Sequence, residues 1–166
     1  MKKMILPVVV ATLLMTSCST SNAESDIGTA KELAAKVCSN AESQLRTASD
    51  LSQVQIKQCE VQTNDSGEIA FILALNDYLE WGVLETKSVE DIIYTVPLGL
   101  VAYAFAKSGV EPEVFNDVLV VLNDSSQTVY DIKPKDLRDV LAVKDEAGAK
   151  QALKDLRSKM EITSID

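Results

Sequence analysis

The sequence predicts an α+β fold with the element order helix, hairpin, helix, hairpin, helix, as if an αββ unit were used twice. Two observations carry this prediction. Two pairs of β-rich runs are each joined by a short cluster of turn residues. Three segments with apolar residues at helical spacing lie before, between and after those pairs. We expect a four-stranded antiparallel sheet packed against the helices, and an all-α bundle is the alternative.

The composition limits the classes of protein and of chemistry. The chain has 166 residues, of which 46% are hydrophobic and 25% charged, as in an ordinary single globular domain. Its net charge of −9 argues against nucleic-acid binding, which needs clustered Lys and Arg. The absence of histidine excludes Ser-His-Asp and Cys-His catalysis and histidine-ligated metals. We therefore expect no catalytic residues, no metal and no cofactor.

The first helix is predicted from Ile27 to about Asp50, at the start of one globular domain spanning residues 27–166. The preceding residues, 18–26, are small and polar and are expected to form a flexible tether. The helix prediction depends on apolar residues that recur at three- and four-residue steps and so share one face. These residues are Ile27, Ala30, Ala34, Val37, Ala41 and Ala48.

The first hairpin is predicted from the runs 54–62 and 69–75, with a turn at 64–67. The apolar side chains of the first run change parity between Ile56 and Cys59, which predicts a β-bulge there. A helix is the alternative for the second run, because a capping box could precede it.

The second helix is predicted from Ser88, with Gly109 as its C-terminal cap. Its uncharged stretch, 92–106, contains Pro97 and is too short to span a bilayer, so we expect a kinked, buried helix. The second hairpin follows, with strands at 118–122 and 128–132. Helical spacing over 133–159 then predicts a helical C-terminal segment.

The N-terminus is typical of a secretory signal peptide, residues 1–17. Two lysines precede an uncharged run, 4–15, that is too short to span a bilayer. The residues Met15-Thr16-Ser17-Cys18 resemble the lipobox of bacterial lipoproteins, although Met15 stands where leucine is usual. The resemblance covers residues 1–18 and implies cleavage after Ser17 and lipidation of Cys18, which would anchor the domain to a membrane.

The same resemblance implies a location in the bacterial cell envelope. Ser19 follows the cysteine, and in the enterobacterial version of the family this implies sorting to the outer membrane, facing the periplasm. The alternative is ordinary signal cleavage after Ala23, which would release a soluble periplasmic protein. Cleavage after Ser17 leaves fourteen basic and twenty-five acidic residues, a net charge of −11.

Two cysteines remain once Cys18 is assigned to the lipid. Cys38 and Cys59 would lie in an oxidising compartment, so we predict that they form one structural disulfide. Two buried free thiols are the alternative. The chain has neither a Cys-x-x-Cys redox motif nor the spacing of a four-ligand zinc site.

Acidic residues beside two aromatic side chains form the candidate binding surface. Asp77, Glu80 and Glu85 lie close in sequence to Tyr78 and Trp81, and large aromatics often anchor protein interfaces. The competing interpretation is that at least one of the aromatics packs in the core. More generally, the acidic charge lies before residue 133, and the basic segment 133–159 is expected to pair with it.

These observations support three hypotheses about function. The first is a non-catalytic envelope lipoprotein that binds another envelope protein, a basic partner being favoured by the charge. The second is an inhibitor or immunity protein that blocks a basic toxin or muramidase. The third is a carboxylate-based hydrolase, for which no specific motif exists, so we expect a protein that is not an enzyme.

Overall fold

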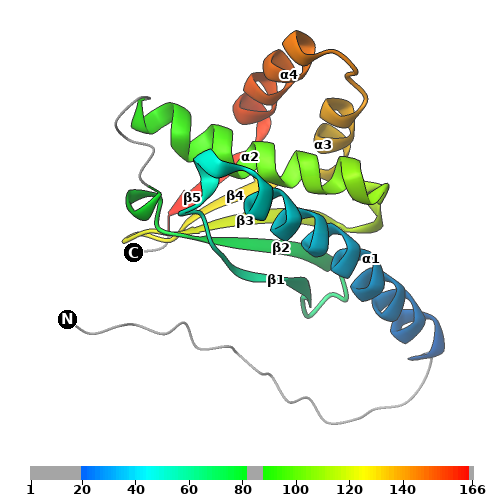
Figure 1. Ribbon diagram of the computed structural model, residues 1–166. Helices are drawn as coiled ribbons and strands as arrows, with labels where there is room; N and C mark the ends of the chain where they lie inside the picture. Colours follow the sequence, from blue (N-terminus) through cyan, green and yellow to red (C-terminus); the bar gives the residue numbers. More distant parts are fainter. Residues whose placement is uncertain (1–19, 82–87, 165–166) are drawn as a thin grey trace.

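A five-stranded sheet, with the described helices on one of its faces, forms the framework of the protein (Figure 1). The computed structural model describes residues 20–81 and 88–164. The strands, in their order across the sheet, are β1 (Ile56–Thr63), β2 (Ile69–Asn76), β3 (Asp117–Asn123), β4 (Thr128–Ile132) and β5 (Glu161–Ser164). The α-helices are α1 (Thr20–Thr47), α2 (Val89–Ser108), α3 (Pro134–Leu141) and α4 (Glu146–Lys159), and the short 3₁₀ helices include η1 (Ser49–Leu51), η2 (Tyr78–Glu80) and η4 (Pro112–Val114).

The sheet is mixed, whereas the two hairpin signals predict an antiparallel sheet of four strands. The pairs β1–β2, β3–β4 and β4–β5 are antiparallel, but the central pair β2–β3 is parallel. The α2 helix connects β2 to β3, and parallel neighbours require such a crossover. The α+β class is confirmed and the all-α alternative is wrong. The antiparallel arrangement is corrected to a mixed sheet with a fifth strand.

The two hairpins are not spatial copies of each other. Their first strands, β1 and β3, run in opposite directions, because β2 is antiparallel to β1 and parallel to β3. Their turns, in contrast, are alike. The side chain of Asn64 accepts the backbone N–H groups two and four residues ahead in the first turn, and Asp124 does the same in the second. The predicted αββ repeat is therefore a recurrence of element types and of this turn, and not of strand direction.

The first hairpin has the irregularity that the sequence predicts. The pairing of β1 with β2 shifts register between Ile56 and Gln58, which is the predicted bulge. The run 69–75 lies within strand β2, so its helical alternative is wrong. At the turn, Gly67 has a φ of 79°, a left-handed conformation that glycine adopts without strain.

The α1 helix extends further toward the N-terminus than its apolar periodicity predicts. It begins at Thr20, so most of the segment expected to be a tether is helical. No described side chain before Ala30 is buried, and an unpacked helical turn leaves no apolar pattern in the sequence. The buried face is the predicted one and is built from small side chains, Ala30, Ala34, Val37 and Ala41.

The α2 helix lies within the predicted bounds and carries Pro97 inside it. Proline has no N–H to donate to the carbonyl four residues earlier, which belongs to Ile93. The hydroxyl of Tyr130 on β4 donates to that carbonyl instead, at 2.9 Å. The proline thus leaves the Ile93 carbonyl available for the bond by which Tyr130 ties α2 to the sheet. None of the described helices combines the length and apolar character needed to cross a membrane.

The C-terminal segment is two helices and a strand, where the spacing predicts helix alone. A break at 142–145 separates α3 from α4, and Asp145 caps α4 by accepting the N–H of Gly148 at 2.7 Å. β5 then adds to the edge of β4. The predicted pairing with the acidic body occurs through Lys133, 2.8 Å from Asp117, and through Arg138, 2.6 Å from Glu113.

The core lies between the helices and the sheet face that they cover. Three aromatic rings form its centre. The ring centroid of Phe71, on β2, lies 5.3 Å from that of Phe105, on α2, and 5.5 Å from that of Phe115. Along β3, buried and half-buried residues alternate regularly. The buried ones point toward the helices, so the other set faces away from the core.

Candidate functional site

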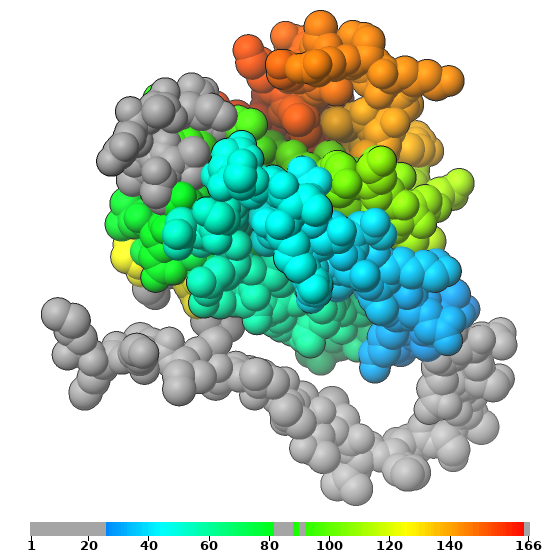
Figure 2. Space-filling view, in the orientation of Figure 1, coloured from blue at the N-terminus to red at the C-terminus, as the bar shows by residue number. Residues whose placement is uncertain are grey.

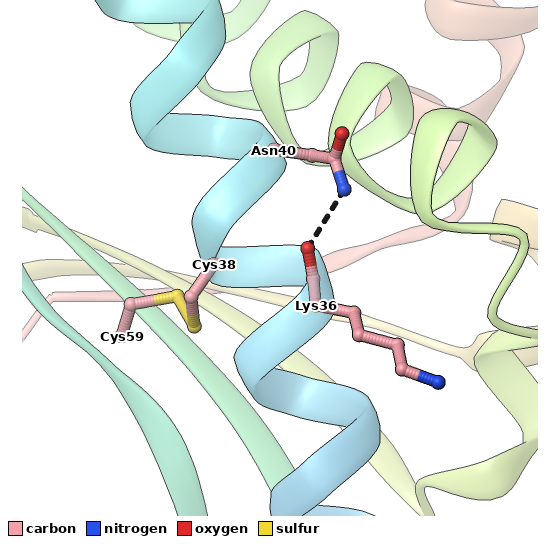
Figure 3. The surroundings of a disulfide bond; sticks show 4 residues. All are labelled: Lys36, Cys38, Asn40 and Cys59. Carbon is pink, nitrogen blue, oxygen red and sulfur yellow. Dashed lines mark hydrogen bonds between the residues drawn. A yellow bond between two sulfur atoms is a disulfide. The ribbon is translucent and has the colours of Figure 1, made fainter.

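The predicted disulfide is present and joins α1 to the edge strand β1 (Figure 3). Cys38 and Cys59 are bonded, with their Cα atoms 5.8 Å apart. The bond lies beside a groove of about 540 Å³ between α1 and β1. Cys59 belongs to the strand face that points toward the helices and pairs in register with Leu73, a core residue. The disulfide therefore fixes α1 on the covered face of the sheet.

The predicted aromatic pair is positioned by η2, immediately after β2. Trp81 is only 2% exposed and packs in the core, so its indole is not available to a partner. Tyr78 is half-buried against the same core. Leu79, an apolar side chain of the same segment, is 61% exposed. Core packing, the competing interpretation, is thus the role of Trp81.

The carboxylates beside these aromatics have local structural roles. Asp77 caps η2 by accepting the N–H of Leu79 at 2.9 Å. Glu80 accepts a hydrogen bond from the side chain of Asn76, also at 2.9 Å. Glu85 and Cys18, the remaining predicted site residues, lie outside the described residues. The structure therefore brings Asp77, Tyr78, Glu80 and Trp81 into one short segment but gives most of them internal partners.

Asn76 organises this segment and has no recognisable signal in the sequence. It is 1% exposed and lies at the carboxyl end of β2. Its side-chain oxygen accepts the indole N–H of Trp81 and the backbone N–H of Gln55, each at 2.8 Å. Its amide nitrogen donates to Gln53 O at 3.0 Å and to Glu80. One side chain thus satisfies its full hydrogen-bonding capacity and joins three parts of the chain.

The most unusual surface is the sheet face opposite the helices, which we call the open face. No described helix lies over it (Figure 1). The pairing register and the alternation of side chains assign its centre to β2, β3 and β4. Its apolar strip consists of Ala70, Ile72, Ala74, Leu119, Val121 and Val129.

The apolar strip lies outside the hydrophobic core cluster. None of its six residues is among the buried core cluster or the side chains packed against that cluster. Four residues of the strip are half-buried, namely Ile72, Leu119, Val121 and Val129. The short side chain of Ala74 is 4% exposed, and it lies between the longer side chains of Gln58 and Val121. Strands with one solvated face normally alternate apolar with polar residues. The strands β2 and β3 are instead apolar on both faces, which is typical of strands covered on both sides.

Polar and acidic side chains border the strip on both sides. On β1, Glu60 accepts hydrogen bonds from Gln58 at 2.7 Å and Gln62 at 3.0 Å. These two bonds hold the pKa of Glu60 below its ordinary value, and the bond from Gln62 has the larger effect. The carboxylate therefore stays ionised. On the far side lie Asp131 of β4 and Glu161 of β5, paired in register.

Lysine side chains lie beside the acidic border of the open face. Lys133 is 2.8 Å from Asp117 and 3.2 Å from Asp131, so it bridges the ends of β3 and β4. Both carboxylates raise the pKa of the lysine. Asp117 and Asp131 thus share Lys133, and Lys31 of α1 lies close enough to Glu60 to help lower the pKa of that carboxyl. With Glu161, the border has four carboxylates beside these two lysines, so it carries a net negative charge.

A second cleft, of about 470 Å³, lies between α2 and α4 on the helical side. It is lined by Tyr94 and Leu98 of α2 and by Lys150, Lys154 and Arg157 of α4. The guanidinium of Arg157 stacks on the ring of Tyr94, 3.7 Å from its centroid, and Lys150 pairs with Glu146. In Figure 2, α3 and α4 stand above α2 as an orange projection. Arg157 therefore takes part in packing α4 against α2, and Lys150 pairs within its own helix.

The described residues offer little for carboxylate chemistry. A general acid at neutral pH needs a raised pKa. The carboxyl pKa shifts that are resolved, those of Glu60 and Glu146, are both downward, because Gln62 and Gln58 donate to the first and Lys150 to the second. Among the described residues, no three metal-ligating side chains lie close enough to hold an ion.

Comparisons with protein-family models, with curated proteins and with solved structures give no match for this chain. The site is therefore defined by its own geometry. Of the features found, the open face combines six apolar side chains outside the core cluster with a border of one predominant charge. That combination makes it the candidate functional site.

Proposed function

We propose that the protein is a non-catalytic protein-binding module of the bacterial envelope, that the lipid on Cys18 anchors it, and that its contact surface is the open face. The observation that carries this proposal is the apolar strip on β2, β3 and β4, which lies outside the core and is bordered by carboxylates. Large exposed apolar patches with a polar border mark interaction sites.

The shape of the surface favours a protein over a small molecule. Small ligands bind in concave pockets that bury most of their surface. The strip is instead one face of a sheet, three strands wide, with half-buried side chains along its centre. Removing such side chains from water favours the association of two proteins.

The contact surface is tested by photo-crosslinking in living cells. A photoreactive residue replaces Leu119 on the open face, and a control replaces the exposed Glu32 on α1. We expect one adduct of defined mass from position 119 and none from position 32. Equal adduct yields at both positions, or no adduct from 119, would contradict the proposal.

The anchor is tested separately by mass spectrometry of the mature N-terminus. The proposal expects a peptide that begins with an acylated Cys18. An unmodified peptide that begins at Glu24 would overturn the anchor and indicate a soluble periplasmic protein. The open face would keep its role in that case, because no residue of it lies near the N-terminus in sequence.

An inhibitor or immunity protein is the second candidate, and the acidic border of the open face supports it. The carboxylates on both sides of the apolar strip would attract a basic toxin or muramidase. Cells that carry Glu60→Gln together with Asp131→Asn should then lose protection against such an effector. Unchanged protection in these cells, at unchanged protein level, would dismiss this candidate.

A further inference from the structure

Across the strands, the space between the acidic residues matches the width of one helix. Glu60, Ile72, Leu119, Asp131 and Glu161 occupy consecutive strands in one row of the register. Neighbouring strands lie about 4.8 Å apart, so the acidic positions on β1 and β4 are about 14 Å apart. An α-helix with its side chains is about 10 Å across. One helix therefore fits between Glu60 and Asp131.

Along the strands, the strip has the length of a short helix. Its longest line runs on β2 from Ala70 to Ala74, about 13 Å at roughly 3.3 Å per residue. A helix rises 1.5 Å per residue, so about nine residues cover this length. The short side chains of Ala70 and Ala74 flank Ile72 and lower the surface at both ends of β2, which gives room for larger side chains of a partner.

The two sides of the strip attract cations. Gln58 and Gln62 hold the carboxylate of Glu60 in place from both sides. On the opposite side, Asp131 has Lys133 as a neighbour, but this lysine is shared with Asp117. Glu161 lies one strand further out, and its register position adds a second carboxylate to that side. Cations of a partner can therefore pair with a carboxylate on either side of the strip.

We infer that the open face binds one amphipathic helix of a partner protein, which lies along β2 and β3 with an apolar stripe against the strip and with Lys or Arg on both of its flanks. This inference rests on the proposed function and adds the shape and charge of the partner. The cations of the helix reach Glu60 on one side and Asp131 and Glu161 on the other. A helix bound in this way contacts the surface through apolar residues at positions i, i+3 or i+4, and i+7.

The same geometry disfavours other occupants. A second sheet packed face to face would cover the border carboxylates as well as the strip, and buried carboxylates without partners are costly. A second copy of this open face would place its acidic border against the first one, and the two would repel each other. An anionic membrane surface would repel the acidic border in the same way. A basic helix leaves the carboxylates at its solvent-exposed sides and covers only the apolar residues.

The inference is tested with synthetic helical peptides and the isotope-labelled mature protein. Three stapled 14-residue peptides share one composition of apolar residues: one has a leucine stripe with Lys flanks, one has the same stripe with Glu flanks, and one has Lys with the leucines scattered around the helix. We expect only the first to bind and to shift backbone resonances on β2, β3 and β4. Binding of the scattered peptide with equal affinity, or shifts confined to the α2–α4 cleft, would overturn it.

Protein variants separate specific recognition from the general acidity of the chain. Glu60→Gln with Asp131→Asn should weaken binding of the Lys-flanked peptide about tenfold, since each removes a carboxylate beside the strip. The matched control is Glu32→Gln with Glu111→Gln, two exposed acids outside the open face, which should leave the affinity unchanged. Equal weakening by both pairs would contradict the inference. Val121→Thr should also weaken binding while the protein keeps its melting temperature.

The partner segment captured in cells distinguishes this inference from the proposed function. The adduct formed from position 119 is digested and the crosslinked partner peptide is sequenced. A helical segment with Lys or Arg beside an apolar stripe supports the inference. A β-strand, a segment of a second copy of this chain or a lipid would overturn the helix and leave the open face as the contact surface. The absence of any adduct would instead refute the proposed function.

Discussion

At the scale of single residues, Asn76 connects the end of β2 to the segment that follows the first helix and to Trp81. Its four side-chain hydrogen bonds replace the ladder bonds that a strand loses where it ends. The bonded groups include the indole N–H of Trp81, which is buried and has Asn76 as its acceptor. Asn76 therefore provides the acceptor that the buried indole N–H of Trp81 needs.

We predict that Asn76→Ala lowers the free energy of unfolding by about 3 kcal/mol. The substitution leaves the indole N–H of Trp81 and the backbone N–H of Gln55 without their acceptor, and each unsatisfied buried group costs about 1–3 kcal/mol. Asn123 is the matched control, because it pairs with Asn76 across the parallel strands and makes one side-chain bond, to Leu75 O. Asn123→Ala should cost about 1 kcal/mol. Urea denaturation of both variants checks this, and equal losses would contradict it.

The role of Asn76 could not be predicted from the sequence. An asparagine that ends an apolar run is an ordinary turn signal, and its four partners lie in segments whose proximity depends on the tertiary fold. The placement of Trp81 follows from the same contacts. The disulfide was predictable, because two cysteines in an oxidising compartment leave few alternatives.

At the scale of elements, the proline in α2 and the tyrosine in β4 form one structural unit. Pro97 leaves the Ile93 carbonyl without its usual helical donor, and the hydroxyl of Tyr130 replaces that donor. Burial raises the pKa of Tyr130, so the hydroxyl stays protonated and remains a donor. The carbonyl left without a helical donor and the attachment of α2 to the sheet thus have the same cause.

We predict that Tyr130→Phe and Pro97→Ala are energetically coupled. In the natural chain, Tyr130→Phe leaves the Ile93 carbonyl without a hydrogen-bond donor and should lower the free energy of unfolding by about 2 kcal/mol. With alanine at position 97, the restored N–H can bond to that carbonyl, so Tyr130→Phe should then cost about 1 kcal/mol less. Chemical denaturation of the two single variants and the double variant gives the coupling energy. Equal costs in both backgrounds would contradict this prediction.

Most elements were predictable because their signals are local. The bulge near Ile56 follows from a parity change within one strand, and the bounds of α2 follow from its cap at Gly109. The parallel pairing of β2 with β3 was not predictable from turn residues, since each hairpin signal ends at its own strands. β5 is four residues long and has no buried residue, so only its pairing with β4 defines it.

At the scale of the whole molecule, the sheet has two apolar faces, and the described helices all lie on the side of one of them. The signal for this was present in the sequence, because the runs in β2 and β3 are apolar at nearly every position, as in strands buried on both sides. The acidic border was not predictable. It comes from β1, β4 and β5, whose residues become neighbours only through the register of the sheet.

We predict that two leucines on the same strand differ sharply in their contribution to stability. Leu122 is 1% exposed and points to the helices, so Leu122→Ala should lower the free energy of unfolding by about 3 kcal/mol. Leu119 is half-buried on the open face and outside the core cluster, so Leu119→Ala should cost about 1 kcal/mol or less. Thermal and chemical denaturation of both variants checks the difference. A similar loss in both would mean that the open face is covered.

The early start of α1 has a consequence for how far the domain stands from its anchor. Between Thr20 and Ala30, the first described residue of α1 whose side chain is buried, the helix rises about 15 Å. If Cys18 carries the lipid, this stretch is a stiff stalk, and it continues into a helix that a disulfide clamps to the sheet. The domain would then hold a set height and a restricted tilt above the bilayer. Its partners would be those that present a helix within that narrow zone.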